Sequence, residues 1–196
     1  MQQIVDFVLE LEKLKGVTRK IRPLGLERYE SSAEHSWQLA MFATALVEYA
    51  AAPVDLDRVI RMLLVHDIGE IDTGDTIAFA EGGWEERKAA ELAAVTWIFA
   101  LLPEPQREPL LSLWCEFEAG QTAESRFANA VDRATPVLLN LNNNGQSWRE
   151  NGISYERVVR RVEAQISAGC PALWEYIAAR LAEARDAGWF GSVVSS

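Results

Sequence analysis

Apolar residues recur along the chain at steps of three and four positions, and runs that alternate apolar and polar residues are rare. This is the period of an amphipathic helix that buries one stripe in a core. The chain is also rich in Ala, Leu, Glu and Arg, which are good helix formers. The pattern therefore predicts an all-α fold, with helices over about residues 2–15, 31–51, 56–68, 84–102, 106–119, 122–141, 154–168 and 171–187.

Start and stop signals support several of these boundaries. Ser31 and Glu34 form a capping-box pattern, in which each side chain satisfies a free backbone amide at the start of a helix. Gly16 and Pro53 are expected to end the first two helices, because neither continues a helix without cost. The polar cluster at 142–147 predicts a turn. We therefore expect a bundle of helices joined by loops.

Length and composition indicate one folded unit. The chain has 196 residues, of which 49% are apolar and 24% are charged, as in ordinary globular proteins. No change in composition and no internal repeat marks a second domain. We predict a single helical domain over residues 1–190 and a short flexible tail at 191–196.

The charge balance bears on the class of partner. Lys and Arg total 19 against 29 Asp and Glu, a formal net charge of -10. Such a surface repels polyanions, so nucleic acid is not an expected partner. A small phosphorylated molecule remains compatible, because one metal ion and one or two arginines can reverse the potential inside a single cleft.

The sequence also bears on the compartment. The N-terminal apolar stretch carries acidic residues and has no basic region before it, unlike a signal peptide. No uncharged apolar run approaches the ~20 residues that span a bilayer. Cys115 and Cys170 form no CxxC or zinc-type cluster, as expected of free thiols in a reducing compartment. The expected location is cytoplasmic, without membrane contact.

The chain has only two histidines, and one of them belongs to the dipeptide His66-Asp67 at the end of an apolar helix. A buried carboxylate costs several kcal/mol unless hydrogen bonds or a cation compensate it. This position therefore indicates either a metal ion or a fully satisfied polar network.

Two further residues favour the metal. His35 lies in the first turn of another helix, and Asp132 interrupts an apolar helical stretch. Side chains from neighbouring helices of a bundle can converge on one centre. Two imidazoles and two carboxylates would suit one divalent ion, Mn, Co, Fe, Ni, Zn or Mg, in a site left open for water and substrate.

In this order and placement, the four side chains resemble the ligand set of the HD-domain phosphohydrolases, which is His, His-Asp and a distant Asp. More narrowly, AEHSW at 33–37 and HDIGEIDTGD at 66–75 are similar to the five-prime deoxynucleotidase branch of that superfamily. The similarity extends over about residues 11–148. It implies a single-domain helical bundle of the HD-domain type, with the metal site between helices.

The resemblance implies roles for two acidic residues. In that branch, the residues corresponding to Glu70 and Asp75 handle the attacking water and the leaving group. Glu70 follows Asp67 by one helical turn, close enough to act as general base on a metal-bound water. Asp75, in a loop, would orient the water or protonate the departing alkoxide. The simpler alternatives are a helix-capping role for Asp75 and a solvated position for Glu70.

The phosphate of a substrate also needs a cation. A guanidinium binds phosphate through two parallel hydrogen bonds, so the loop residues Arg19 and Arg28 are candidates. Arg19 matches the family's phosphate-binding arginine, but Lys20 follows it where the family has Trp, which affects the contact to the sugar. Lys88 and Glu91 also resemble family positions near the site, although an exposed helical ion pair is the simpler interpretation.

The tryptophans divide into two groups. Trp37, Trp97 and Trp114 lie on apolar helix faces and are expected in the core. Trp84 and Trp148 lie near loops and are candidates for contacts with the substrate or a second subunit.

These features predict a metal-dependent phosphohydrolase, 5′-nucleotidase-like, that releases phosphate from (deoxy)nucleoside 5′-monophosphates by a metal-activated water. One alternative is an HD hydrolase of another phosphoester, such as guanosine tetraphosphate, a dinucleotide or a sugar phosphate. Another is a helical interaction protein with a structural metal. The expected partners are a small phosphorylated substrate and a second copy of the chain in a homodimer.

Overall fold

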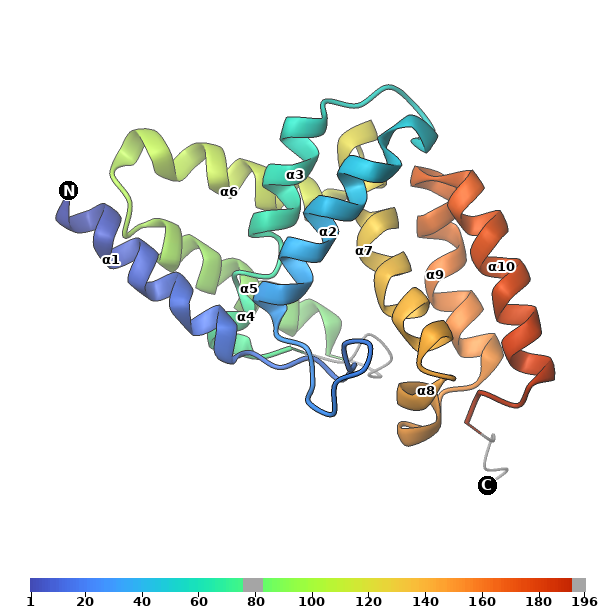
Figure 1. The fold of residues 1–196 in the computed structure, drawn as a ribbon. Helices are drawn as coiled ribbons and strands as arrows, with labels where there is room; N and C mark the ends of the chain where they lie inside the picture. The colour runs from blue at the N-terminus through green and yellow to red at the C-terminus, as the bar shows by residue number, and fades with distance from the viewer. Residues whose placement is uncertain (76–82, 192–196) are drawn as a thin grey trace.

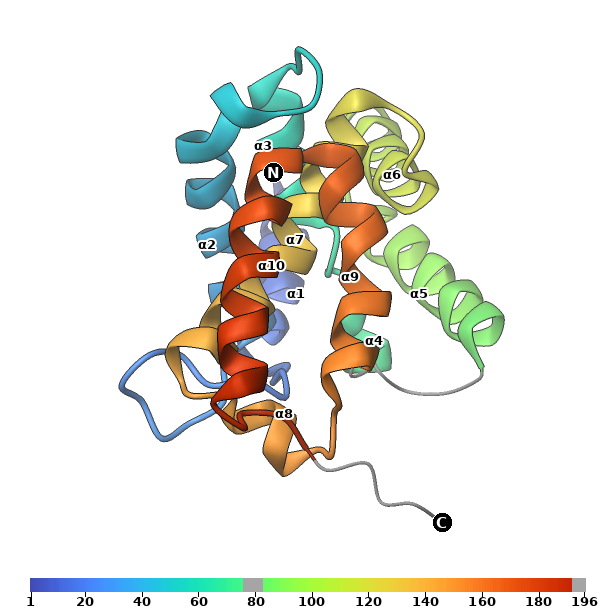
Figure 2. The same ribbon diagram turned by 90° about the vertical axis from the view of Figure 1, so that its right-hand side faces the viewer.

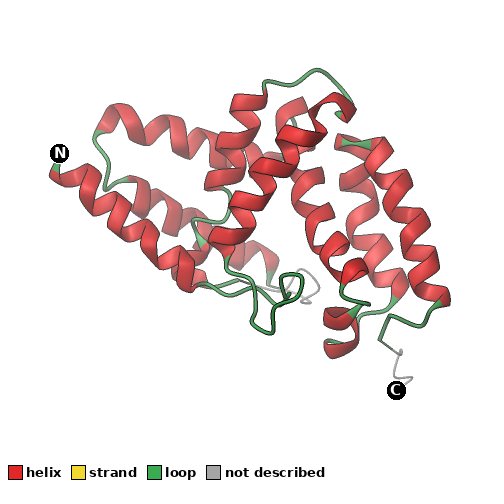
Figure 3. Cartoon of the chain, in the orientation of Figure 1, coloured by secondary structure: helices red, strands yellow, loops and turns green. Residues whose placement is uncertain are grey.

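The computed structural model describes residues 1–75 and 83–191, and every regular element in these ranges is a helix (Figure 3). The predicted all-α fold is confirmed. The elements are α1 (Gln2–Leu11), η1 (Glu12–Gly16), α2 (Ser32–Leu46), η2 (Val47–Tyr49), α3 (Leu56–Val65), α4 (Glu70–Thr73), α5 (Trp84–Phe99), α6 (Glu104–Ala119), α7 (Ala123–Asn142), α8 (Gln146–Glu150), α9 (Tyr155–Gly169) and α10 (Pro171–Asp186).

Helix α7 lies at the centre of the bundle. It packs against α2, α3 and α6 as well as against α9 and α10. Figure 1 shows α1, α5 and α6 on one side of the α2–α3 pair, and α9 and α10 on the other. The view in Figure 2 shows α9 and α10 side by side, in agreement with their contacts. The centre of α7 is therefore enclosed by helices from both halves of the chain.

The sequence of α7 accounts for this position. Its side chains are buried over most of its length, and Phe127, Val131 and Val137 join the main hydrophobic core. Burying each such side chain contributes roughly 1.5–3 kcal/mol. Asp132 is buried in the same helix. A carboxylate in this setting needs a partner, so the middle of α7 is where the site is expected.

The loop between η1 and α2 is held by hydrogen bonds between its two arms. Thr18 and Ser31 form an isolated antiparallel bridge. The amide of Arg19 donates to the carbonyl of Glu30 at 2.8 Å, and the amide of Glu30 donates to the carbonyl of Ile21 at 2.9 Å. These bonds hold Arg19 and Glu30 beside the start of α2.

Several predicted boundaries are confirmed and others are wrong. The capping box of Ser31 and Glu34 is present at the start of α2. The first predicted helix is too long, because α1 ends at Leu11 and the chain continues as a 3-10 turn to Gly16. The predicted turn at 142–147 is shorter than expected, since the helical turn α8 begins inside it.

Two tryptophans predicted in the core lie at the surface. Trp37 is 67% exposed and Trp97 is 50% exposed, whereas Trp114 is buried as predicted. Trp148, predicted near a ligand or a second subunit, is instead buried and stacks on Phe190 with ring centroids 4.6 Å apart. Apolar residues lie on several sides of α2 and α5, so their period does not single out one buried face.

The end of the chain packs on the bundle. Trp189 and Phe190 lie against the main core, and the amide of Gly191 donates to the carbonyl of Ile153. The predicted tail at 191–196 falls outside the described residues except for Gly191. In the part of the chain that the structure describes, no helix is both long and apolar enough to cross a bilayer.

Candidate metal centre and substrate cavity

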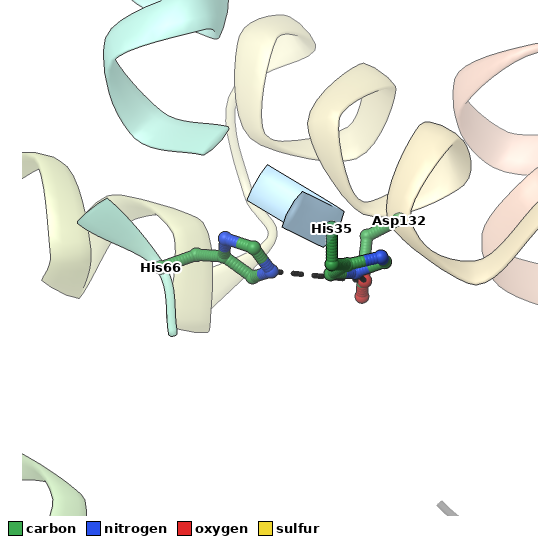
Figure 4. Close-up of side chains that lie close together, drawn as sticks. All are labelled: His35, His66 and Asp132. Atoms are coloured by element: carbon green, nitrogen blue, oxygen red, sulfur yellow. Dashed lines mark hydrogen bonds and ion pairs between the residues drawn. The ribbon is translucent and has the colours of Figure 1, made fainter. Parts of the chain in front are cut away.

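Three side chains that can bind a metal come from three different helices. His35 lies in the first turn of α2, His66 directly follows α3, and Asp132 lies in the middle of α7. All three are buried. Because α2 and α3 both pack on α7, the side chains converge at the centre of the bundle, where Figure 4 shows them facing one another.

The distances fit one ligand sphere. One ligand atom from each of the three residues lies within 4.8 Å of the others. Oδ1 of Asp132 is 3.0 Å from Nε2 of His35 and 3.7 Å from Nε2 of His66. Asp67 lies beside this group and outside its 4.8 Å criterion, with its Oδ1 3.0 Å from Nε2 of His66. The structure thus brings together all four residues that the sequence suggested as ligands.

The ring of His66 is fixed from three sides. Its Nδ1 lies 2.9 Å from the carbonyl of Leu63, which can only accept a hydrogen bond, so Nδ1 carries the proton. The ring packs against Phe117, with centroids 4.9 Å apart. Trp114 donates from Nε1 to the His66 carbonyl at 3.0 Å. These contacts leave Nε2 directed at the cluster, where Oδ1 of Asp67 lies 3.0 Å away.

The other imidazole has a carboxylate behind it. Nδ1 of His35 lies 3.6 Å from Oε2 of Glu30, and both residues are almost fully buried. A carboxylate behind a ligating histidine orients the ring and makes its other nitrogen a better ligand. Burial lowers the pKa of His35 to about 4, so its ring is neutral at physiological pH. A neutral imidazole is the form that binds metals.

Asp67 stands between the cluster and an arginine. Its Oδ1 faces His66, and its Oδ2 accepts a hydrogen bond from Arg19 at 2.9 Å. Arg19 is also 3.6 Å from Glu30 and 3.9 Å from Asp75. The loop arginine singled out from the sequence is therefore a partner of several carboxylates at once.

The cluster contains more carboxyl groups than cations. Burial raises the pKa of Glu30 to about 7, although Arg19 opposes the shift. Burial and then the charge of Asp67 raise the pKa of Glu70 to about 9. Burial also raises the pKa of Asp75. These shifts have one cause, because several acidic groups share a desolvated space with one buried guanidinium.

A divalent cation fits this cluster. Nε2 of His66 is buried without a well-aligned hydrogen bond, and, against the effect of burial, the carboxylates of Asp67 and Asp132 raise the pKa of His66 well above its ordinary value, so positive charge is favoured at this position. Two imidazole nitrogens and two carboxylates are a common donor set for transition metals in open sites. A double positive charge would also offset the excess of acidic groups. The residues present are therefore those that would hold the ion.

Glu70 and Asp75 both lie beside the cluster. Glu70 begins the short helix α4, and its Oε2 accepts a hydrogen bond from Ser32 at 2.6 Å. Asp75 lies next to Arg19 and accepts a hydrogen bond from the amide of Lys20. Both carboxyl groups line the cavity that reaches the cluster. Neither is a solvated surface group, which was the simpler alternative for Glu70.

The cluster opens into a cavity of about 400 Å³, called here the main cavity. This volume lies within the range of about 300–1,000 Å³ that small-molecule sites occupy. His66, Asp67 and Asp132 form part of its wall, and Arg19 lies beside them. Lys88 and Trp84 also line it, and Lys88 is paired with Glu118 at 3.0 Å.

Arg28 lies elsewhere. Its guanidinium donates two hydrogen bonds to the carboxylate of Glu34, at 2.8 and 2.5 Å. It lines a different surface hollow and not the main cavity. Arg28 is paired with Glu34, the capping residue of α2, so the structure does not bring Arg28 to the cluster.

Other residues at the site were not found from the sequence. Glu30 and Ser32 flank the start of α2, and their places directly before His35 were a usable signal. Arg133 follows Asp132 in the chain and lies 3.7 Å from it, which adjacency could also have indicated. Arg161, on α9, lines the main cavity but looks like any other charge on an amphipathic helix.

Comparisons with known proteins agree with this geometry. The family model described as "HD domain" matches residues 11–174. The human protein named 5′-deoxynucleotidase HDDC2 is 29% identical over 67% of this chain and 65% of its own length. The Xenopus laevis protein of the same name is 30% identical over 68% of each chain. The chain thus spans about two thirds of the length of these curated relatives.

A solved structure extends the likeness to nearly the whole chain. The Magnetospirillum magnetotacticum MS-1 protein described as a "predicted metal-dependent phosphohydrolase" is 38% identical and has a TM-score of 0.91. The match covers 97% of this chain and 95% of that one. The resemblance inferred from the sequence motifs is confirmed, and the chain belongs to the HD domain family.

Proposed function

We propose that the chain is a metal-dependent phosphohydrolase that releases inorganic phosphate from nucleoside 5′-monophosphates, including deoxynucleotides. The observation that carries this proposal is the convergence of His35, His66 and Asp132 within one ligand sphere at the wall of a cavity. Asp67 is the fourth proposed ligand. The relatives named 5′-deoxynucleotidases and the phosphohydrolase from Magnetospirillum support the reaction class.

A divalent ion held by these residues would lower the pKa of a water molecule and offset the charge of a phosphate. The chain supplies the rest of the chemistry. Glu70 is proposed to take the proton of the attacking water, and Ser32 holds its carboxyl group in place through the 2.6 Å hydrogen bond. Without a cation, burial and then the charge of Asp67 raise the pKa of Glu70 to about 9, so the base role requires the positive charge of a bound ion to lower this pKa and leave the carboxylate ionised.

Asp75 is proposed to give a proton to the departing alkoxide. Burial raises its pKa, so a share of the carboxyl groups is protonated at higher pH than is usual for aspartate. Arg19 lies 3.9 Å from Asp75 and 2.9 Å from Asp67. It is therefore placed to bind the phosphate oxygens between the proposed acid and a proposed ligand. Lys88 is a second cation on the same cavity wall.

The location of the site favours an enzyme over a helical protein with a structural metal. A structural site is closed, whereas this cluster meets a cavity of about 400 Å³ whose lining includes further acidic and basic residues that are not proposed ligands, among them Arg19, Glu70 and Asp75. A cytoplasmic homodimer remains part of the proposal. The exposed Trp37 and Trp97 are aromatic surface that a second subunit could cover.

Substitution of the proposed ligands tests the proposal. We expect His66→Ala and Asp67→Ala to lose bound metal, measured by elemental analysis of the purified protein. Hydrolysis of deoxynucleoside monophosphates should fall by more than about 100-fold, beyond the loss typical of an outer-sphere partner. Asp57→Ala, at an exposed position in the first turn of the same helix α3, is the matched control and should keep both properties. Unchanged turnover in either ligand variant would refute the assignment.

A further inference from the structure

A pair of arginines lies where the main cavity meets a smaller hollow. Arg133 on α7 and Arg161 on α9 line both the main cavity and a pocket of about 90 Å³, called here the side pocket. The walls of the side pocket are mostly apolar and include Val137, Trp148 and Ile153. Arg19, Asp75 and Asp132 also line both spaces, so the two guanidinium groups belong to a charged junction between the main cavity and the side pocket.

The positive charge of this pair is not balanced by the residues around it. Arg133 lies 3.7 Å from Oδ2 of Asp132 and donates from Nε to Gln165 at 3.1 Å. Arg161 has no carboxylate within 4.0 Å among the described residues, and its Nε is buried without a hydrogen-bond partner. Asp132 is therefore the carboxylate that lies nearest to Arg133 and also acts electrostatically on Arg161, and it is already a proposed metal ligand.

The electrostatics of Arg161 agree with this imbalance. Burial and then the charge of Arg133 lower its pKa to about 10, and Asp132 opposes the shift only in part. Its Cζ lies over the ring of Trp84, 4.9 Å from the ring centroid, and Cζ of Arg87 lies over the same ring at 4.6 Å. Stacking satisfies the face of a guanidinium but leaves its N–H donors, which lie at the edge, for another partner.

The pair has different charged partners from Arg19, the cation proposed for the scissile phosphate, although all three arginines line both the main cavity and the side pocket. Arg19 interacts with Asp67 and Asp75, while the charged groups that act on Arg161 are Arg133 and Asp132. Asp132 is common to both sets. A phosphate that contacts Arg19 and the metal centre would leave the donors of Arg161 for a different anion.

We propose that Arg161 and Arg133 bind a second phosphate of the substrate, carried on the sugar, so that the preferred substrate is a nucleoside bisphosphate. This inference rests on the proposed phosphohydrolase function and names its substrate class. In the reaction, a water oxygen bonds to the 5′ phosphorus, the bond from phosphorus to the 5′ ester oxygen breaks, and that oxygen gains the proton. The sugar phosphate held by the arginines remains on the product.

The test compares 2′-deoxyadenosine 3′,5′-bisphosphate with the 5′-monophosphate, using phosphate release by the metal-loaded protein. We expect kcat/KM to be about 10- to 100-fold higher for the bisphosphate, the range for hydrogen bonds to a charged group. Arg161→Met, which removes the charge and keeps an apolar side chain, should lower kcat/KM for the bisphosphate much more than for the monophosphate and so remove this preference. Arg161→Lys should restore part of it, because a single ammonium cannot bind phosphate bidentately.

Controls and a second readout make the outcomes distinct. Arg160→Met, at an exposed neighbouring position of α9, should behave as the unsubstituted chain. Calorimetric titration of the chelator-treated protein should show tighter binding of the bisphosphate, lost in Arg161→Met, whether or not hydrolysis occurs. Equal kcat/KM for the two nucleotides, a preference for the 5′-diphosphate, or equal loss of both activities in Arg161→Met would overturn the inference. Tighter binding of the bisphosphate that is lost in Arg161→Met, without hydrolysis of either nucleotide, would uphold the phosphate site of Arg161 and Arg133 and refute both the phosphohydrolase proposal and the substrate assignment.

Discussion

One hydrogen bond decides what the ring of His66 can offer a metal. The carbonyl of Leu63 belongs to the last turn of α3, where carbonyl groups lack a helical partner. It accepts a hydrogen bond from Nδ1 of His66. The carbonyl of His66 itself accepts from Trp114. The end of α3 thus satisfies its free carbonyls and orients the imidazole by the same contacts. The ring is positioned before any ligand arrives, as a preorganised site requires.

At the start of α2, the charge of Glu34 contributes to the stability of the fold. Arg28 first, and then the amide of Ser31, lower the pKa of Glu34 to about 2. Because the folded value lies below the ordinary one, the ionised carboxylate stabilises the fold above about pH 4.5, and this contribution is lost as the pH falls toward 2. We expect Glu34→Gln to lower the free energy of unfolding by about 0.5–1 kcal/mol at pH 7, a modest effect because the pair is exposed to solvent.

Urea unfolding at pH 7, 5 and 3 measures this effect. The difference between Glu34→Gln and the unsubstituted chain should shrink between pH 5 and pH 3. Glu48→Gln is the control, since Glu48 is exposed and forms no ion pair among the described residues. A difference that persists unchanged at pH 3 would show that the charge of Glu34 is not its source.

At the scale of the helices, the approach of α9 to α7 is set by a glycine. A Cβ atom at Gly169 would lie 2.1 Å from the carbonyl oxygen of Arg126 and 2.7 Å from Cβ of Ala130. Neither atom can move without moving α7. We expect Gly169→Ala to destabilise the protein by about 1–3 kcal/mol, as overpacking does, although alanine is the better helix former.

Denaturant midpoints of two glycine variants separate packing from propensity. Gly16→Ala places its Cβ in open space and should change the free energy of unfolding by less than about 0.5 kcal/mol. If Gly169→Ala unfolds at the same urea concentration as the unsubstituted chain, the close approach of α7 and α9 does not constrain the bundle.

The sequence predicted these helices better than it predicted their faces. Helix α3 is apolar on most sides in sequence and was expected to run through the core; its Val59, Met62 and Leu63 are buried, but its Leu64 is 48% exposed. Helix α2 has apolar residues on several sides, so Trp37 was placed in the core although it lies at the surface. Period identifies a helix from neighbours in sequence, but the buried face of a widely apolar helix depends on packing with distant elements.

The same distinction holds for the site. His35, His66 and Asp132 could be selected because each is a polar residue in an apolar helical setting. Arg161 could not, because a single arginine on an amphipathic helix is the usual surface pattern, and only the contact of α9 with α7 brings it to the cavity. Arg28 was selected from the sequence but does not reach the site. Its ion pair with Glu34 depends on how the loop before α2 folds back, which the sequence does not show.

At the scale of the whole molecule, the metal centre joins helices that are far apart in sequence. His35 and Asp132 are 97 positions apart, on α2 and α7, and His66 follows α3. These three helices form the middle of the bundle. An ion bound only by the folded chain stabilises it by about 2.7 kcal/mol at one hundred times its dissociation constant.

Removal of the metal should therefore lower the melting temperature of the whole protein in a single transition. For a chain of this size, about 2.7 kcal/mol corresponds to a fall of about 5–10 °C. Scanning calorimetry before and after chelation, with Mn²⁺ or Zn²⁺ added back, measures the shift. Cys115→Ser should retain the full shift, which excludes the exposed thiol as the ligand, whereas His35→Ala should melt at the same temperature with and without metal. The opposite result would be a melting temperature of the unsubstituted chain that stays the same after chelation and after metal addition. In that case α2, α3 and α7 are held together without the ion, and the four side chains at their centre do not bind it.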